Sequence, residues 1–386
     1  MTLCDFGDIR PYTDEEAVEA LGRVSRHPMT PVISKYLFPE LPASALSKRL
    51  RAIGSVDQFQ AEVMYAAVES IIRKTSAGVT WAGTEYIKTL GDRKFLIVSN
   101  HRDIVLDPAL IQYMLKQEGL ATTEICVGSN LLGNPLVEDL MRSNRMIKVI
   151  RGLGPRELYE SARRLSGYIR DSIASGRASI WIAQREGRTK DGHDATEQGV
   201  LKMLEMSGKG DFEADFGALC IVPLSISYEY ESCDARKARE VLLRRQGPYV
   251  KKKKEDLHSI LTGIRQQKGR IHLQVGEPLT AAEIAEAARA GGNERYQQLC
   301  RALDRRITGG YRLWKTNFIA HDLLHAKNEF LDAGRYDAAD RTQFEAYVAH
   351  KLGKLERRLD RRELRKIFLE IYAGPVDAFV TQFILC

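Results

Sequence analysis

The chain has 386 residues, 44% of them hydrophobic and 28% charged, which is the composition of a globular protein and excludes an intrinsically disordered chain. Its net charge of +7 suits solubility, and it equally suits an anionic partner such as a phosphate-bearing metabolite, a carrier protein or a membrane surface. No apolar run approaches the roughly 20 residues that cross a bilayer, and the first eight residues lack a signal-peptide pattern, so we expect a cytoplasmic protein with at most peripheral membrane contact.

Residues 1–90 read as a helical N-terminal region. Ser55-Val56-Asp57-Gln58 resembles a capping box, and the apolar residues that follow recur at helical spacing until Gly78. Residues 79–86 are a candidate edge strand. The apolar stretch 31–41 has two interpretations, insertion into a membrane interface or packing against the core.

Residues 91–280 alternate short β-branched runs with helical stretches, which predicts an α/β core. A clear amphipathic helix should begin near Pro155 and stop at Gly176. Strands separated by such helices form a largely parallel twisted sheet flanked by helices. Pro223 within a strand predicts an edge or a kink. The expected strands are 94–99, 124–127, 146–150, 179–183, 221–227 and 270–275.

Residues 281–386 read as a helical C-terminal region without internal repeats. His321, His325 and Glu329 recur every four residues, which aligns them on one helical face where they could bind a metal. Because other polar residues stand among them, we interpret them as an ordinary polar face and expect no metal.

The first candidate for chemistry is a histidine directly after a buried strand. Ser-Asn-His-Arg-Asp follows the apolar run 95–98, which places His101 at a strand's carboxyl end, where open α/β sheets carry their sites. Histidine suits proton transfer near neutrality, and a carboxylate can fix its tautomer. Asp103 and Asp107 are both within reach in a tight turn. Asp107 also fits a helix N-cap before Pro108, and Asp103 a solvated turn residue.

Two further strands end in cations. Arg151 follows the strand 146–150, and Gln-Arg-Glu-Gly-Arg-Thr-Lys follows the strand 179–183. If these ends converge with His101, the site suits proton transfer beside a bound anion. A solvated loop with a local ion pair is an equal alternative for the second segment.

Other functions find less support. No Gly-x-Ser-x-Gly nucleophile elbow is present, and the six cysteines show no Cys-x-x-Cys spacing, which predicts reduced thiols. The basic run 251–254 fits a membrane surface or a solvated helix start. Because aromatic residues are not interleaved with it beyond Tyr249, we expect no nucleic-acid binding.

These segments, in this order, resemble the four motif blocks of the glycerolipid acyltransferases, the family that includes the 1-acylglycerol-3-phosphate acyltransferases. Asn100-His101 with a following Asp resembles the family's Asn-His-x4-Asp block, and residues 147–151 resemble the second block, which ends in arginine. Residues 186–188 resemble the Glu-Gly-Thr-Arg block, and Val222-Pro223 the fourth. The resemblance spans about residues 95–230.

The chain departs from the family pattern at two places, which indicates a divergent branch. Position 106, where the family has its Asp, is Leu, so the available acids are Asp103 and Asp107. We favour Asp107, because a Pro-Ala-Leu helix start follows it, and this choice requires a one-residue bulge. The third block lacks the Thr between Gly187 and Arg188.

The resemblance implies transfer of a fatty acyl group from a thioester, acyl-CoA or acyl carrier protein, to the hydroxyl of a lysophospholipid or glycerol-phosphate acceptor, with no bound cofactor. His101 would be the general base and an Asp its orienter, and backbone N–H groups after His101 are candidate oxyanion donors. The expected substrate-binding residues are Asn100, Arg102, Lys148, Arg151, Arg185, Glu186, Gly187 and Arg188.

Two alternatives stay open. One keeps the chemistry with a lyso-aminolipid as acceptor, and the other is a non-catalytic lipid- or anion-binding module. In either case we expect the protein in the cytoplasm, peripherally associated with the inner face of the membrane. The oligomeric state is left open.

Overall fold

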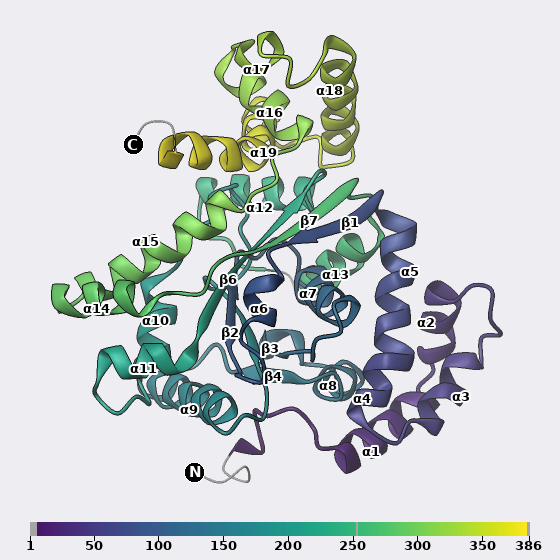
Figure 1. Ribbon diagram of the computed structural model, residues 1–386. Helices are drawn as coiled ribbons and strands as arrows, with labels where there is room; N and C mark the ends of the chain where they lie inside the picture. The colour runs from purple at the N-terminus through teal and green to yellow at the C-terminus, as the bar shows by residue number, and fades with distance from the viewer. Residues whose placement is uncertain (1–5, 252–253, 384–386) are drawn as a thin grey trace.

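A seven-stranded sheet in the order β1-β7-β6-β2-β5-β3-β4 runs through the centre of the molecule (Figure 1). The computed structural model describes residues 6–251 and 254–383. Neighbouring strands are parallel except for the antiparallel pair β6 and β7. The largely parallel α/β fold is therefore confirmed. The strands are β1 (Gly78–Ala82), β2 (Leu96–Ser99), β3 (Glu124–Gly128), β4 (Met146–Val149), β5 (Ile180–Ala183), β6 (Ile221–Tyr228) and β7 (Arg270–Val275).

Helices precede, connect and follow the strands. Those before β1 are α1 (Asp14–Arg26), α2 (Thr30–Leu37), α3 (Ala45–Ala52), α4 (Val56–Phe59), the π-helical turn η2 (Gln60–Met64) and α5 (Tyr65–Thr75). Those between strands are α6 (Glu85–Lys88), α7 (Leu106–Gln117), the 3₁₀ turn η3 (Ser129–Leu131), α8 (Pro135–Arg142), α9 (Pro155–Ala174), α10 (Gln198–Glu205), α11 (Phe212–Leu219), α12 (Asp234–Gln246) and α13 (Glu255–Arg265). Those after β7 are α14 (Ala281–Ala290), α15 (Glu294–Gly309), α16 (Lys315–His325), α17 (Glu329–Asp332), α18 (Ala338–Gly353) and α19 (Arg361–Phe383).

The central strand β2 shows why the sheet is buried on both faces. Successive side chains of a strand point to opposite faces. Leu96 and Val98 accordingly pack into one apolar cluster with α9, α10, α11 and α15, whereas Ile97 packs into another with α7. All three side chains are fully buried. The continuous apolar run of this strand is thus explained by two helical layers.

The helix expected between Pro155 and Gly176 forms α9. Pro155 occupies the first turn, where its missing N–H breaks no hydrogen bond. Gly176 lies just beyond the end with a φ of +73°, a conformation that glycine adopts without strain. The buried stripe of Leu165, Ile169 and Ile173 faces the sheet.

Pro223 does not mark an edge strand, because β6 lies between β7 and β2. Its carbonyl accepts from the Gly276 amide at 2.8 Å, just past the end of β7, and its register partner on β2 is Val98. A residue's N–H and C=O point to the same side of a strand, so the missing N–H faces the end of β7. The ladder with β2 therefore loses no hydrogen bond.

The two ends of the chain form separate helical layers (Figure 1). Helices α1 to α5 share one apolar cluster beside the sheet, and α12, α16, α18 and α19 share another. Helices α14 and α15, the first two of the expected helical region 281–386, pack on the sheet. The candidate edge strand at residues 79–86 forms β1 (Gly78–Ala82), which lies at one edge of the sheet.

Among the helices of residues 6–251 and 254–383, none combines the length and apolar character that crossing a bilayer demands.

Lys268, two residues before β7, is a buried lysine whose burial should affect the stability of the protein. Lys268 has no exposed surface, and its Nζ donates to the Gln266 carbonyl at 2.6 Å and to Thr75 Oγ1 at 3.3 Å. Burial lowers the pKa of Lys268 from its usual 10.5 to about 8. Between these pH values the unfolded chain binds more protons than the folded one, so this group makes the free energy of unfolding rise with pH.

We therefore expect Lys268→Met to stabilise the protein at pH 7 by about 1–3 kcal/mol, with a gain that shrinks toward pH 10. Urea unfolding of both proteins at several pH values measures the difference. A difference that stays constant from pH 7 to pH 10 would contradict the assigned burial cost.

Candidate active site

The turn after β2 holds His101 against a carboxylate. His101 Nδ1 lies 2.8 Å from Asp107 Oδ2. The imidazole is 14% exposed and Asp107 is fully buried. Because the carboxylate accepts from Nδ1, the opposite nitrogen Nε2 keeps its lone pair for an incoming proton. The Trp181 ring packs edge-on to the imidazole, with the ring centroids 5.7 Å apart.

Asp107 is fixed by donors on both of its oxygens. Oδ2 also accepts from the backbone amides of Arg102, at 2.5 Å, and Asp103, at 2.8 Å. Oδ1 accepts from the Tyr228 hydroxyl at 2.7 Å. Burial and the negative charge of Asp107 raise the pKa of Tyr228 well above its usual value, so this hydroxyl stays a donor. The carboxylate is thereby held rigidly and aligned with His101.

The helix-capping role considered for Asp107 belongs to Asp103. Helix α7 begins at Leu106, and Asp103 Oδ1 accepts from the amides of Val105 and Leu106, both at 2.8 Å. Its other oxygen accepts from Ser232. Asp103 is therefore a buried residue that closes the turn, and not a solvated one, because the helix starts two residues earlier than its Asp-Pro signal predicts.

Asn100 and Arg102, expected to bind substrate, lie in a buried network behind His101. The Arg102 guanidinium pairs with Asp194 at 2.5 Å and with Glu231 at 3.2 Å. The Asn100 side chain bonds the backbone of Ile226 on β6 through both amide atoms, at 2.8 and 3.1 Å. Burial would raise the pKa of Asp194, but Arg102 and the hydrogen bonds keep that pKa below its usual value. Both expected residues thus support the turn from inside and do not line the large cavity described next.

His101 opens into a cavity of about 1070 Å³. Its walls come from the N-terminal helices, the sheet-facing helix α7 and helix α13, and they are mostly apolar. Tyr36 of α2 joins the two sides, since its hydroxyl lies 3.5 Å from the Ile264 carbonyl at the end of α13. Apolar lining residues include Ile33, Val63, Val68, Ile71, Ile260 and Ile264.

Cationic side chains line the same cavity as His101. Arg151, Arg185 and Arg188 are among the lining residues, together with Gly187. Arg151 lies 3.6 Å from Glu186, whose side chain is 74% exposed. Arg188 Nη1 is buried and has no hydrogen-bond partner among the described residues. The strand ends therefore do bring a histidine and several arginines to one cavity, with Arg188 as an unused donor.

Other cations near the site are already paired or lie elsewhere. Lys148 donates to Glu138 at 3.2 Å and does not line the cavity. Lys190 and Lys251 line it, but both are paired. Lys190 lies 2.5 Å from Glu240 of α12, and Lys251 lies 2.6 Å from Asp256 of α13. Glu186, expected to contact substrate, is not among the lining residues either. Of the basic run, Lys252 and Lys253 lie outside the described residues.

Four of the backbone amides after His101 are not free to stabilise an oxyanion. Those of Arg102 and Asp103 donate to Asp107, and those of Val105 and Leu106 donate to Asp103. For these four amides the expected oxyanion role is wrong, because the turn uses them to hold the two carboxylates.

Sequence reasoning missed the contacts that support the histidine from distant segments. Tyr228 stands five residues after Pro223 of the fourth block, and nothing else in the sequence pointed to it. Trp181 points back toward β2, where its Nε1 donates to Ser99 Oγ at 2.9 Å. Asp194, in the loop after β5, carried no signal, since its partner Arg102 lies 92 residues away.

Comparison with known proteins gives consistent results. Residues 78–227 match the acyltransferase family. The chain is 24% identical over 292 residues to the dihydroxyacetone phosphate acyltransferase of Mus musculus, and 23% identical over 298 residues to that of Bos taurus. These alignments cover 74% and 75% of this chain and 41% of each relative, so the chain spans about two fifths of the length of the proteins that it matches.

Proposed function

Residues 78–227 are an acyltransferase domain of the glycerolipid acyltransferase family, and we propose that this domain transfers a fatty acyl group from a thioester to the hydroxyl of a phosphate-bearing lipid precursor. One observation carries the proposal. The His101–Asp107 pair opens into a mostly apolar cavity that is also lined by several arginines. This arrangement matches an acyl chain joined to a polar reaction centre next to an anion.

In the proposed mechanism, His101 Nε2 removes the proton of the acceptor hydroxyl as its oxygen attacks the thioester carbonyl. The tetrahedral intermediate then collapses, the C–S bond breaks, and the imidazolium returns the proton to the thiolate. A positioned base of this kind supplies about 10²–10⁴-fold in rate. Asp107 keeps the proton on Nδ1 and stabilises the imidazolium.

The acyl chain would occupy the apolar part of the cavity. Each CH₂ group removed from water contributes about 0.8 kcal/mol, so a long chain gains several kcal/mol there. Four exposed apolar residues at Met29, Val32, Leu257 and Leu261 also line this cavity. We propose that they form a mouth that rests on the inner face of the membrane, from which chain-bearing substrates enter.

The acceptor's phosphate would lie at Arg151, Arg185 and Arg188. Arginine binds phosphate through paired hydrogen bonds, and Arg188 has a buried donor without a partner among the described residues. Because the two relatives are dihydroxyacetone phosphate acyltransferases, dihydroxyacetone phosphate is the first acceptor to test.

Arg188→Gln should raise the KM for a phosphate-bearing acceptor by about 10–100-fold, because losing a hydrogen bond to a charged group costs about 1.5–3 kcal/mol. The effect on kcat should be small. Steady-state kinetics with varied acceptor measure both constants. Arg163→Gln, at an exposed position of α9, is the matched control for charge. An equal loss in both variants would mean that bulk charge, and not a phosphate contact, accounts for the effect.

The experiment that tests the proposed function offers purified protein an acyl-CoA or an acyl carrier protein thioester with a panel of acceptors. The panel contains dihydroxyacetone phosphate, glycerol 3-phosphate, a lysophospholipid and a lyso-aminolipid, in the presence of anionic vesicles. Mass spectrometry should find an acylated phosphate-bearing product, and the protein should sediment with the vesicles. Acylation of the aminolipid alone would favour the alternative acceptor. Lipid binding without any product would favour a non-catalytic module.

A further inference from the structure

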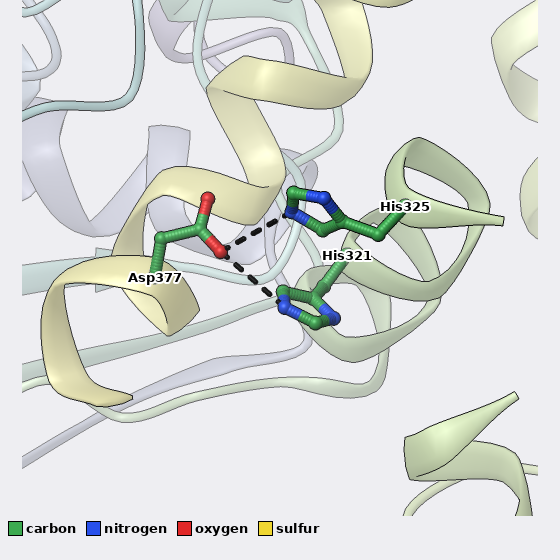
Figure 2. Close-up of side chains that lie close together, drawn as sticks. All are labelled: His321, His325 and Asp377. Carbon is green, nitrogen blue, oxygen red and sulfur yellow. Dashed lines mark ion pairs between the residues drawn. The ribbon is translucent and has the colours of Figure 1, made fainter. Parts of the chain in front are cut away.

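Two histidines and an aspartate meet where α16 packs against α19 (Figure 2). His321 and His325 stand one helical turn apart on α16, and both present Nε2 to Asp377 Oδ1 of α19, at 3.3 and 3.5 Å. Figure 2 shows the carboxylate pointing between the two rings. We propose that these three side chains bind a divalent metal ion of the zinc type, independently of the acyl-transfer site.

The distances fit coordination better than direct hydrogen bonding. With bonds of about 2.0–2.1 Å, the ligand atoms of a tetrahedral zinc site lie about 3.3–3.4 Å apart. The separations of Asp377 Oδ1 from the two imidazole nitrogens match this edge length. They exceed the usual range of about 2.7–3.2 Å for an N–H···O bond. All three ligand atoms lie within 4.8 Å of one another, so small rotations of the side chains suffice to close the site.

The other nitrogen of His321 supports the same conclusion. His321 Nδ1 and Asp322 Oδ1 are both buried, lie 3.6 Å apart, and have no hydrogen-bond partner among the described residues. Asp322 is fixed through its other oxygen by the Tyr336 hydroxyl and by two backbone amides. A metal-bound histidine commonly donates its free N–H to a carboxylate, which sets its orientation. Binding at Nε2 would give both unpartnered atoms that role.

The ligand set points to zinc among the common divalent ions. Two imidazoles and one carboxylate suit zinc, whereas magnesium and calcium prefer oxygen ligands alone. His325 is 42% exposed and Asp377 32% exposed, so a water molecule can reach the fourth position. Glu329, the third residue of the helical spacing, does not belong to the site, because it lies on α17 next to Lys327.

The site would fasten a weakened part of the C-terminal helix. Pro375 lies inside α19 and cannot donate the backbone hydrogen bond of that turn. Asp377 comes two residues later, so a metal would hold the segment after the proline against α16. None of the three ligands lines the cavity that contains His101, and acyl transfer should therefore not depend on the metal.

The proposal is tested by titrating the full-length protein with Zn²⁺ and following binding by calorimetry. The protein carries no affinity tag and is first treated with a chelator. We expect one ion per chain and a rise in the melting temperature. His325→Ala and Asp377→Asn should each weaken binding by at least about 100-fold, more than the loss of an outer-sphere partner costs. His350→Ala, at an exposed position of α18, should bind as the unaltered protein does.

Cobalt provides a second readout of the same site. Co²⁺ bound by two imidazoles and a carboxylate should give the visible absorption of a tetrahedral complex, absent from both ligand variants. The four free cysteines described in the structure are the competing zinc ligands, and binding through them would survive His325→Ala and Asp377→Asn. Stoichiometric binding that both variants retain, or no binding by the unaltered protein, would overturn the proposal.

Discussion

Replacing His101 with alanine should lower kcat for acyl transfer by about 10²–10⁴-fold, the range that a positioned general base supplies. The imidazole is the titratable group that Asp107 aligns toward the cavity, so its loss removes the acceptor of the hydroxyl proton. Thioester consumption, followed as release of free thiol, measures the rate. The melting temperature should change little, because the ring is partly exposed and fills no core position.

The control for this substitution is His350→Ala, since His350 is exposed on α18, away from the cavity. Its rate should equal that of the unaltered protein. A His101→Ala variant that folds normally and keeps its turnover would remove His101 from the mechanism.

Asp107→Asn should produce the second large loss, about 10²–10³-fold in kcat with little change in KM. The amide keeps the shape of the carboxylate and can still accept from the backbone of Arg102 and Asp103. It removes the negative charge that stabilises the imidazolium formed when His101 accepts the hydroxyl proton. Initial rates with both substrates varied separate kcat from KM.

Asp103→Asn is the matched control, because Asp103 is equally buried and stands in the same turn. Its bonds go to the start of α7 and to Ser232, so its loss should appear as about 1 kcal/mol in the free energy of unfolding. Its effect on kcat should be the smaller of the two. A larger rate loss for Asp103→Asn than for Asp107→Asn would show that Asp103, and not Asp107, orients His101.

The sheet was predictable because its signals are local. Each strand is a short apolar run bounded by turn residues, and β2 is buried along its whole length, as continuous apolar character predicts. His101 and the arginines could be found for a related reason. Site residues of a parallel sheet lie at the carboxyl ends of its strands, so in the sequence they come directly after the apolar runs. The choice between Asp103 and Asp107 depended on where α7 starts, and helix boundaries are weakly encoded.

The burial of Arg102 and Asn100 could not be predicted from their neighbours in the chain. Both point inward because they bond to Ile226 on β6, to Asp194 and to Glu231, at separations of 92 to 129 residues. Tyr228 reaches Asp107 across 121 residues for the same reason. Such contacts follow from strand order, which local pattern does not specify. The cluster at Asp377 is a further case, because the third ligand comes from another helix.

A structure of the protein bound to a non-hydrolysable acyl-thioether analogue of the donor tests the central claim most directly. We expect the acyl chain to lie in the apolar cavity between α2 and α13, with its carbonyl-equivalent carbon next to His101 Nε2. Its polar end should point toward Arg151, Arg185 and Arg188. A chain bound on another face, with the reactive carbon out of reach of His101, would contradict the account.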